Sequence, residues 1–173
     1  MKTAAAVCLL CLLTLAAASC GYHLQAATGS RFADPNLRID LRPFANASLV
    51  PDAGAFLAGR LREELRQMGV RGTFDRAGAD ILVEGVVQDI REEVLSHDSK
   101  GFALEHRLTI IVDVRVVEVV KGHLLWKEEG LSEGASYFAG VDFQYTEANR
   151  RAAIEEVCRR MAKRIGQTVR VIL

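Results

Sequence analysis

The strongest pattern in the chain is an alternation of apolar and polar residues in its second half. From Phe102 to Val116 the even-numbered positions are apolar, apart from His106, while most odd-numbered positions carry polar side chains. A period of two places neighbouring side chains on opposite faces of a β-strand. Strands usually have about 5–6 residues, so this pattern predicts an unusually long strand with one buried face and one polar face.

Further strands are expected around this one. Residues 81–95 are rich in Val and Ile and predict a second long strand, joined to the first by a hairpin tip at residues 96–101. The pair Lys121-Gly122 predicts a tight turn into another strand through residues 124–126. Near the start, residues 37–41 alternate between apolar and charged side chains and predict a short, half-buried strand. The sequence therefore predicts a sheet built around a long central hairpin.

Two segments show the helical period of 3.6 residues. The first begins after Asp52, a residue type favoured at the N-cap, runs to Met68 and ends at Gly69. The second covers about residues 147–169. Their apolar stripes are Phe56, Leu57, Leu61, Leu65 and Met68 in the first and Ile154, Val157, Cys158, Met161 and Ile165 in the second. Because residues three and four positions apart share one helix face, each segment is expected to pack against another element.

The remaining segments give weaker signals. Residues 70–74 predict a weak strand, residues 77–78 a turn, and residues 44–48 and 132–145 irregular structure. The element order is then β-α-β-β-β-β-α. An α+β fold in which two helices pack on one face of a mostly antiparallel sheet buries the apolar faces of both kinds of element. We expect residues 36–173 to form this single domain.

The first residues form a separate unit. Lys2 is the only charge in residues 1–19, and an apolar run from Ala4 to Ala18 is interrupted only by Thr14. As a helix this run would measure about 22 Å, which is shorter than the hydrocarbon core of a bilayer at about 30 Å. A charged start, a short apolar stretch and small residues at its end are typical of a secretory signal peptide. A buried N-terminal helix is the alternative.

The end of this segment resembles a bacterial lipobox. Residues 17–19 are small and precede Cys20, although Ala17 stands where leucine is commoner. The resemblance implies that cleavage falls before Cys20, that its thiol is acylated, and that Gly21 after it favours the outer membrane. Two or more acyl chains anchor a protein durably to a bilayer, whereas one chain does not. Residues 20–35 are rich in Gly, Ser, Ala and Thr and are expected to form the tether.

Composition narrows the function classes. The 173 residues include 22 basic and 22 acidic side chains, a formal net charge of zero. A nucleic-acid-binding domain usually has a basic excess, so we expect no nucleic-acid partner. Of the four cysteines, Cys8 and Cys11 lie in the signal peptide, where their CxxC spacing is a coincidence. Acylation of Cys20 leaves Cys158 as the remaining thiol, and no intramolecular disulfide is then expected.

The motifs that suggest catalysis lack their required context. Ser132 lies in a G-x-S-x-G pattern (residues 130–134), which as a nucleophile elbow requires a helix directly after the serine and a histidine later in the chain. No helical pattern follows directly, and the last histidine is His123. Residues 96–98, Ser-His-Asp, are neighbours whose side chains alternate in direction in an extended segment. With no metal-ligand spacing either, we expect no enzyme, no metal and no cofactor.

Basic residues on the long hairpin are the candidate ligand-binding groups. An uncovered polar sheet face can present them to an anionic amphiphile, with an ordinary solvated face as the alternative. The candidates are Arg91, Lys100, Arg107, Arg115 and Lys121. The C-terminal helix has a second basic face, for which a solvated surface is again the alternative. Its residues are Arg150, Arg151, Arg159, Arg160, Lys163, Arg164 and Arg170.

Several motifs together resemble one family, the lipopolysaccharide-assembly lipoproteins of the LptE family. The most specific is the expected start of the mature chain, Cys20-Gly21-Tyr22-His23-Leu24. The weaker motifs follow in order, at residues 39–46, 64–69, 79–85 and 121–126, with Ala152-Ala153 in the terminal helix. Together they cover nearly all of the expected mature chain.

The resemblance implies a two-layer α/β sandwich of two helices and four strands that plugs the lumen of an LptD-type outer-membrane β-barrel. It also implies a role in assembling that barrel and in binding lipopolysaccharide during insertion into the outer leaflet. In this hypothesis Cys20 carries the lipid anchor at the periplasmic face of the outer membrane, and the hairpin cations approach lipid A phosphates. A small lipoprotein activator or pilotin of another cell-envelope machine is the alternative.

Overall fold

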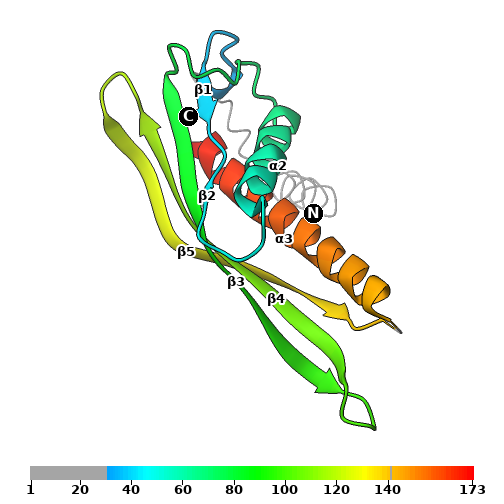
Figure 1. The fold of residues 1–173 in the computed structure, drawn as a ribbon. Coiled ribbons are helices and arrows are strands. Elements are labelled where there is room, and N and C mark those ends of the chain that lie inside the picture. Colours follow the sequence, from blue (N-terminus) through cyan, green and yellow to red (C-terminus); the bar gives the residue numbers. More distant parts are fainter. Residues whose placement is uncertain (1–30, 141) are drawn as a thin grey trace, which may run out of the picture.

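The computed structural model describes residues 31–140 and 142–173. The expected signal peptide, Cys20 and the tether up to residue 30 lie outside the described residues. In chain order, the elements are a 3₁₀ helix η1 (Arg31–Ala33), strands β1 (Ile39–Leu41) and β2 (Ala45–Asn46), helix α2 (Ala53–Gln67), strands β3 (Ile81–His97), β4 (Ala103–Glu118) and β5 (His123–Phe138), and helix α3 (Phe143–Ile172) (Figure 1). None of the helices in these ranges has the length and apolar character needed to cross a bilayer.

The strands form one sheet in the order β1-β3-β4-β5, and β2 pairs with β3 just beyond β1 (Figure 1). β3, β4 and β5 are antiparallel to one another, while β1 and β2 run parallel to β3. The predicted mostly antiparallel α+β fold is confirmed, but the sheet has five strands rather than four. The extra strand arises because residues 45–46, expected in a loop, pair with Val86 and Val87. Two residues are too few to show an alternating pattern.

Both helices cover the same face of the sheet (Figure 1). α2 buries Leu57, Leu61 and Leu65 against α3 and the sheet, as its apolar stripe predicts. The matching residues of α3 are Val157, Cys158, Met161, Ile165 and Val169, and those of β4 are Leu108, Ile110, Val112, Val114 and Val116. The long alternation in the sequence therefore forms the sheet side of one continuous core. Among the described residues, no helix lies over the opposite face of the sheet (Figure 1).

The sheet is long for a domain of this size. β4 alone has 16 residues, which at about 3.4 Å per residue span roughly 50 Å. The tip of the β3–β4 hairpin extends past both helices (Figure 1). The molecule is therefore elongated, with a proximal end near β1 and the start of β3 and a distal end at the hairpin tip.

Helix α3 protects the outer edge of β5. The Asn149 side-chain amide donates to the carbonyl oxygen of Phe138 at 2.8 Å, and the Arg160 guanidinium donates to the carbonyl of Gly134. An edge strand with unpaired backbone groups is a template for pairing with another chain. Side chains of α3 occupy two of these carbonyls, which makes the distal part of this edge less available for such pairing.

The segment after α2 is not the expected strand at residues 70–74. Gly69 turns the chain with a φ of 99°, and only Thr73 makes a β-bridge, with Arg38. Val70 turns inward and is buried. The segment therefore packs Val70 into the core and contacts the sheet through the single bridge at Thr73.

The region expected to be irregular, residues 132–145, is mostly regular. β5 continues to Phe138, and α3 already begins at Phe143. Gly, Ser and Ala weaken the strand signal in residues 130–136, but β4 supplies a continuous antiparallel partner through this range. Tertiary pairing therefore overrides a weak local preference.

The two helices begin differently. Asp52 precedes α2 as expected, but it has a φ of 58° and its side chain makes no capping hydrogen bond. Asp142 caps α3, because its carboxylate accepts from the Tyr145 backbone N–H at 3.0 Å. This cap extends α3 upstream of the predicted start at residue 147.

The thiol of Cys158 is expected to be unreactive in the folded protein. It lies in the core with 2% of its surface exposed, and burial raises its pKa to about 12. Since the thiolate is the reactive species, a thiol reagent at neutral pH should modify Cys158 of the Cys20→Ala mature chain only after unfolding in urea. Rapid labelling of the native chain would contradict this burial.

Candidate functional site

The uncovered face of the sheet is the candidate functional surface. We call it the open face and define it by Arg107, Thr109, Ile111, Asp113, Arg115 and Val117 of β4, together with the residues opposite them in β3 and β5. Directly opposite residues on neighbouring strands point to the same side of a sheet. The open face therefore includes Arg91, which pairs with Thr109, and Lys127, which pairs with Arg115.

The five hairpin cations proposed from the sequence do not form one patch. Arg91, Arg107 and Arg115 share the open face. Lys100 lies at the distal β3–β4 tip, whereas Lys121 lies in the turn between β4 and β5 at the proximal end. Because the length of β4 separates these two turns, a single small ligand cannot contact both lysines.

Arg115 is already neutralised within the sheet. Its Nε donates to Oε1 of Glu84 at 2.7 Å, and Nη1 of Arg42 lies 3.7 Å from the second oxygen of the same carboxylate. Arg42 also donates through Nε to Asp40 at 2.8 Å. This chain of alternating charges links β4 and β3 to β1 and the residue just after it, so its first role is to hold the strands together.

The remaining candidates differ in their charge environment. Arg91 donates through Nε to Asp89 at 2.7 Å, and this hydrogen bond holds the pKa of Asp89 below its ordinary value. Lys121 lies 3.2 Å from Glu118, whose pKa is lowered by hydrogen bonds from Arg31 and from Lys121. Within the described residues, no carboxylate lies at ion-pair distance from Lys100, and the same is true of Arg107.

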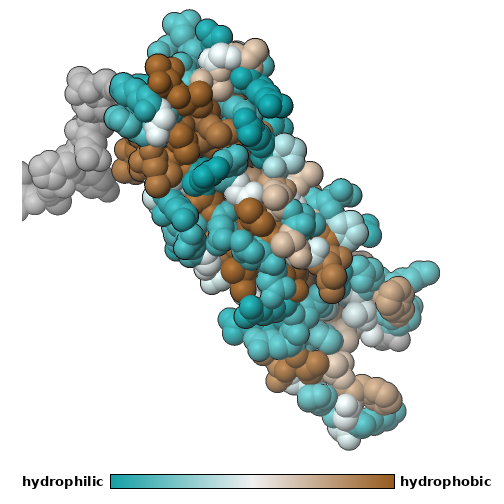
Figure 2. All heavy atoms as spheres, turned by 60° about the vertical axis from the view of Figure 1, so that its left-hand side comes forward, coloured by the Kyte–Doolittle hydropathy of each residue, from teal (hydrophilic) through white to brown (hydrophobic). Residues whose placement is uncertain are grey.

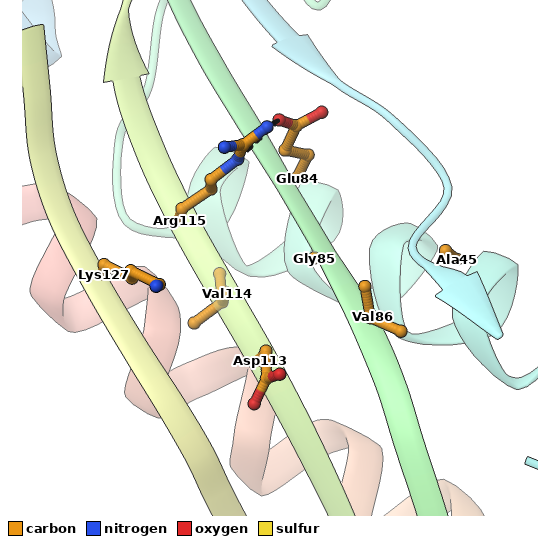
Figure 3. Close-up of a pocket in the computed structure, with 8 residues that line it drawn as sticks. All are labelled: Ala45, Glu84, Gly85, Val86, Asp113, Val114, Arg115 and Lys127. Carbon is orange, nitrogen blue, oxygen red and sulfur yellow. Dashed lines mark hydrogen bonds and ion pairs between the residues drawn. The ribbon is translucent and has the colours of Figure 1, made fainter. Parts of the chain in front are cut away.

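A shallow hollow of about 300 Å³ opens beside Gly85, where β1 and β2 leave a gap along β3 (Figure 3). Val86 and Val114 contribute apolar surface, while Arg115 and Lys127 bring cations to it from two neighbouring strands. The acidic groups are Glu84 and Asp113. Lys127 was not among the sequence candidates, because only the register of β5 places it beside Arg115.

A second hollow, of about 520 Å³, lies on the distal half of the open face. It is lined by two basic and two acidic residues together with Thr109 and Ile111, namely Arg91, Arg107, Glu92 and Glu93. Beyond it the hairpin exposes large apolar side chains, namely Val94, Leu95, Phe102 and Leu104. Val94 is opposite His106 and therefore lies on the other side of the sheet from Arg91 and Arg107, whereas Phe102 lies at the tip. Cations and exposed apolar groups are thus neighbours at the distal end, which is the combination that an anionic amphiphile requires.

The structure does not provide the context of a nucleophile elbow. Ser132 lies inside β5 opposite Ile111, and the strand continues to Phe138 before any helix begins. The Ser-His-Asp neighbours at residues 96–98 lie at the distal end of β3 and in the hairpin turn. Across residues 31–140 and 142–173, no group of three or more His, Cys, Asp or Glu side chains is arranged to hold a metal ion.

The basic face predicted for the C-terminal helix serves mostly to hold the fold together. Arg150 donates to Glu92 of β3 at 2.7 Å, and Arg164 donates to Glu128 of β5 at 2.8 Å. Arg159 pairs with Glu156 on the same helix. These arginines connect α3 to the sheet or to itself and are not free to bind an anion. Within the described residues, Arg151, Lys163 and Arg170 are exposed and have no carboxylate at ion-pair distance.

A family model described as LptE, lipopolysaccharide-assembly, matches residues 37–169 of this chain. The matched range includes every strand of the sheet, all of α2 and most of α3. A search of curated proteins finds no match to the chain.

Solved structures share the architecture at low sequence identity. Rare lipoprotein B from Shewanella oneidensis has a TM-score of 0.55 and 17% identity, covering 76% of this chain and 92% of that one. A putative lipoprotein from Caulobacter crescentus has a TM-score of 0.51 and 14% identity, with coverage of 75% and 88%. A hypothetical protein from Chlamydia trachomatis has a TM-score of 0.52 and 12% identity, with coverage of 78% and 96%. At these identities the likeness shows the fold alone.

Proposed function

This chain belongs to the LptE lipopolysaccharide-assembly family, and from that premise we propose that it is an outer-membrane lipoprotein working with an LptD-type β-barrel. In this proposal an acylated Cys20 anchors the chain at the periplasmic face of the membrane. The folded domain helps to assemble the barrel, plugs its lumen and binds lipopolysaccharide during insertion into the outer leaflet. The role is one of binding and assembly and includes no catalytic step.

The observation that carries this proposal is the extent of the family match. It runs from residue 37 to residue 169 and therefore rests on the whole fold rather than on one motif. The architecture supports the same role, because helices cover one face of the sheet and leave the other face free. A free face roughly 50 Å long gives a plug or a ligand-binding protein a large contact surface.

The distal region is the part of the open face best suited to lipopolysaccharide. That molecule combines anionic phosphates with acyl chains, so its binding surface needs both cations and apolar groups. Arg91 and Arg107 line one hollow there, Lys100 lies at the tip, and Phe102 is 69% exposed beside it. Arg115 and Lys121 are less suited, because their carboxylate partners Glu84 and Glu118 are largely buried, with 21% and 9% of the side chain exposed. Arg91 also pairs with a carboxylate, but that of Asp89 is 45% exposed, and Arg91 itself is 70% exposed. We therefore assign the phosphate contacts to the three distal cations.

The assignment to a barrel complex is tested by affinity purification. The full chain, tagged at its C-terminus and expressed in its native membrane, is expected to bring down a stoichiometric outer-membrane β-barrel that mass spectrometry identifies as LptD-type. Recovery of a cell-wall synthase or of a secretin would support the activator or the pilotin alternative and reject this proposal. A Cys20→Ala chain serves as the control for membrane localisation.

Charge reversal at the distal cations should weaken lipopolysaccharide binding. The variant is Arg91→Glu with Lys100→Glu and Arg107→Glu, and binding of purified lipopolysaccharide is expected to fall at least tenfold, since a charge-assisted hydrogen bond contributes about 1.5–3 kcal/mol. The matched control reverses three exposed cations of α3 instead, with Arg151→Glu, Lys163→Glu and Arg170→Glu. If the hairpin variant binds as well as the control, the distal assignment is wrong.

A further inference from the structure

The proximal end of the molecule has a distinct surface, separate from the distal cations to which we assign the lipopolysaccharide contacts. It is formed by residues 31–38, the loop 69–80, the β4–β5 turn 119–122 and the last residues of α3. Backbone hydrogen bonds join these segments. The Arg31 N–H donates to the backbone oxygen of Leu173 at 2.7 Å, and the Val119 N–H donates to the carbonyl oxygen of Asp80 at 2.8 Å. The described chain begins at this end, so any tether from Cys20 arrives here.

Arginines without acidic partners gather at this end. Within the described residues, no carboxylate lies at ion-pair distance from Arg38, Arg62, Arg66, Arg71 or Arg76. Arg62 and Arg66 are instead held over the ring of Phe74, at 5.7 and 5.2 Å from its centroid. Cation–π contacts of this kind position a guanidinium without neutralising its charge. Elsewhere in the fold, most arginines are paired with Asp or Glu.

Glu118 at this end pairs with Arg31 and Lys121, but three other acidic side chains nearby accept from neutral groups. Asp75 accepts from the backbone N–H of Ala77 at 3.0 Å, and Asp80 accepts from the backbone N–H of Arg38 at 3.0 Å. Glu63 accepts from the Gln67 side-chain amide at 2.9 Å. These carboxylates therefore shape the loop and the helix surface. Arg38 and Arg62 each donate to a backbone carbonyl, of Ala77 at 3.3 Å and of Leu41 at 3.1 Å. The guanidinium groups of Arg66, Arg71 and Arg76 stay available to an external anion.

The same end exposes aliphatic side chains. Val120 in the β4–β5 turn is 80% exposed, Val171 near the C-terminus is 85% exposed, and Leu124 is 57% exposed. Figure 2 shows apolar surface, in brown, gathered toward this upper end of the molecule. Exposed apolar groups bordered by cations are typical of surfaces that bind a membrane or a protein partner.

We propose that the proximal end docks onto the anionic phospholipid surface of the leaflet that holds the lipid anchor. Aliphatic side chains such as Val120 enter the boundary between headgroups and acyl chains, and the arginines contact the lipid phosphates. This inference rests on the proposed acylation of Cys20. Residues 20–30 can span at most about 40 Å at roughly 3.6 Å per residue, which keeps the proximal end close to the anchored leaflet.

The test uses the mature chain with Cys20→Ala, in which the anchor cannot contribute to membrane binding. Cosedimentation is measured with vesicles of phosphatidylcholine alone and with vesicles that also contain phosphatidylglycerol. We expect salt-sensitive binding to the anionic vesicles and little binding to the neutral ones. Arg71→Gln with Arg76→Gln should weaken the binding roughly thirtyfold, because each basic group at an anionic surface contributes about fivefold. Val120→Asp should weaken it as well.

The matched control removes two exposed cations of α3 with Arg151→Gln and Lys163→Gln, and its binding should stay near that of the parent chain. The proposal is wrong if the Arg71→Gln, Arg76→Gln variant binds as well as the parent chain. It is also wrong if the control loses as much binding as that variant, or if the parent chain binds both kinds of vesicle equally. All substituted side chains are exposed, and an unchanged urea-unfolding midpoint checks the fold. Barrel copurification separates the two proposals. If no barrel copurifies but the chain binds anionic vesicles as expected, only the barrel assignment is rejected. If the barrel copurifies but the vesicle binding fails, only this inference is rejected.

Discussion

Replacing Gly54 with alanine is expected to destabilise the fold by about 3 kcal/mol or more, because it forces two backbones apart. A Cβ atom at position 54 would lie 1.9 Å from the carbonyl oxygen of Phe44. The two residues are also joined by a hydrogen bond from Phe44 N–H to the Gly54 carbonyl at 3.2 Å. The first turn of α2 therefore lies directly against the chain that leads into β2, and no side-chain rotation can relieve the contact.

The control for this prediction is Gly59→Ala on the same helix. A Cβ at position 59 would meet nothing within 4 Å, and alanine is a better helix former than glycine by about 1 kcal/mol. This variant should be slightly more stable than the parent chain. Urea unfolding followed by circular dichroism measures both changes, and a Gly54→Ala variant as stable as the parent would show that the packing of α2 on Phe44 is looser than described.

The second large effect is expected at Glu92, which joins three elements. Its carboxylate accepts from the Tyr137 hydroxyl of β5 at 2.6 Å and from Arg150 Nε of α3 at 2.7 Å. The ring of Tyr137 is in turn stacked on His106 of β4, with centroids 5.1 Å apart. Glu92→Leu leaves the buried Tyr137 hydroxyl without its acceptor and leaves Arg150 with its 3.3 Å contact to Glu147 alone. It should lower the free energy of unfolding by about 2–3 kcal/mol.

Glu93→Leu is the matched control, because Glu93 is the next residue of β3 and lies on the open face opposite Arg107. Within the described residues Glu93 makes no hydrogen bond or ion pair through its side chain, so its replacement should change the free energy of unfolding by less than about 0.5 kcal/mol. Equal losses in the two variants would mean that the Glu92 network contributes no stability of its own.

The same network predicts a dependence of stability on alkaline pH. Burial, with a further contribution from Glu92, raises the pKa of Tyr137 above its ordinary value of about 10. Because the folded state favours the protonated phenol, this contribution is fully present below about pH 10 and is lost as the pH rises toward the folded-state pKa. The parent chain should therefore lose more stability than Tyr137→Phe between about pH 10 and the folded-state value, as measured by urea unfolding at each pH.

The functional surface could be predicted only in part from the sequence. The alternation in residues 102–116 correctly separated the buried face of β4 from its polar face, and it placed Arg107 and Arg115 on the polar one. It could not show that Arg115 is neutralised by Glu84, since the two residues are distant in the chain and meet only through the register of β3 and β4. The unpaired arginines of the proximal end were missed for the same reason, because their lack of acidic partners is a property of the folded surface.

The sequence by itself determined the features that arise from local periodicity, namely the long strands, the two amphipathic helices and the fold class. Only the tertiary structure decided which polar groups share a surface, and β3 shows why. Its odd-numbered residues Val83 and Val87 face the helices. After the register shift between Val87 and Asp89, the even-numbered Ile90 faces them instead. A simple count along the strand would therefore have buried Arg91. A β-bulge reverses every later side chain, and it is visible only once the partner strand is in place.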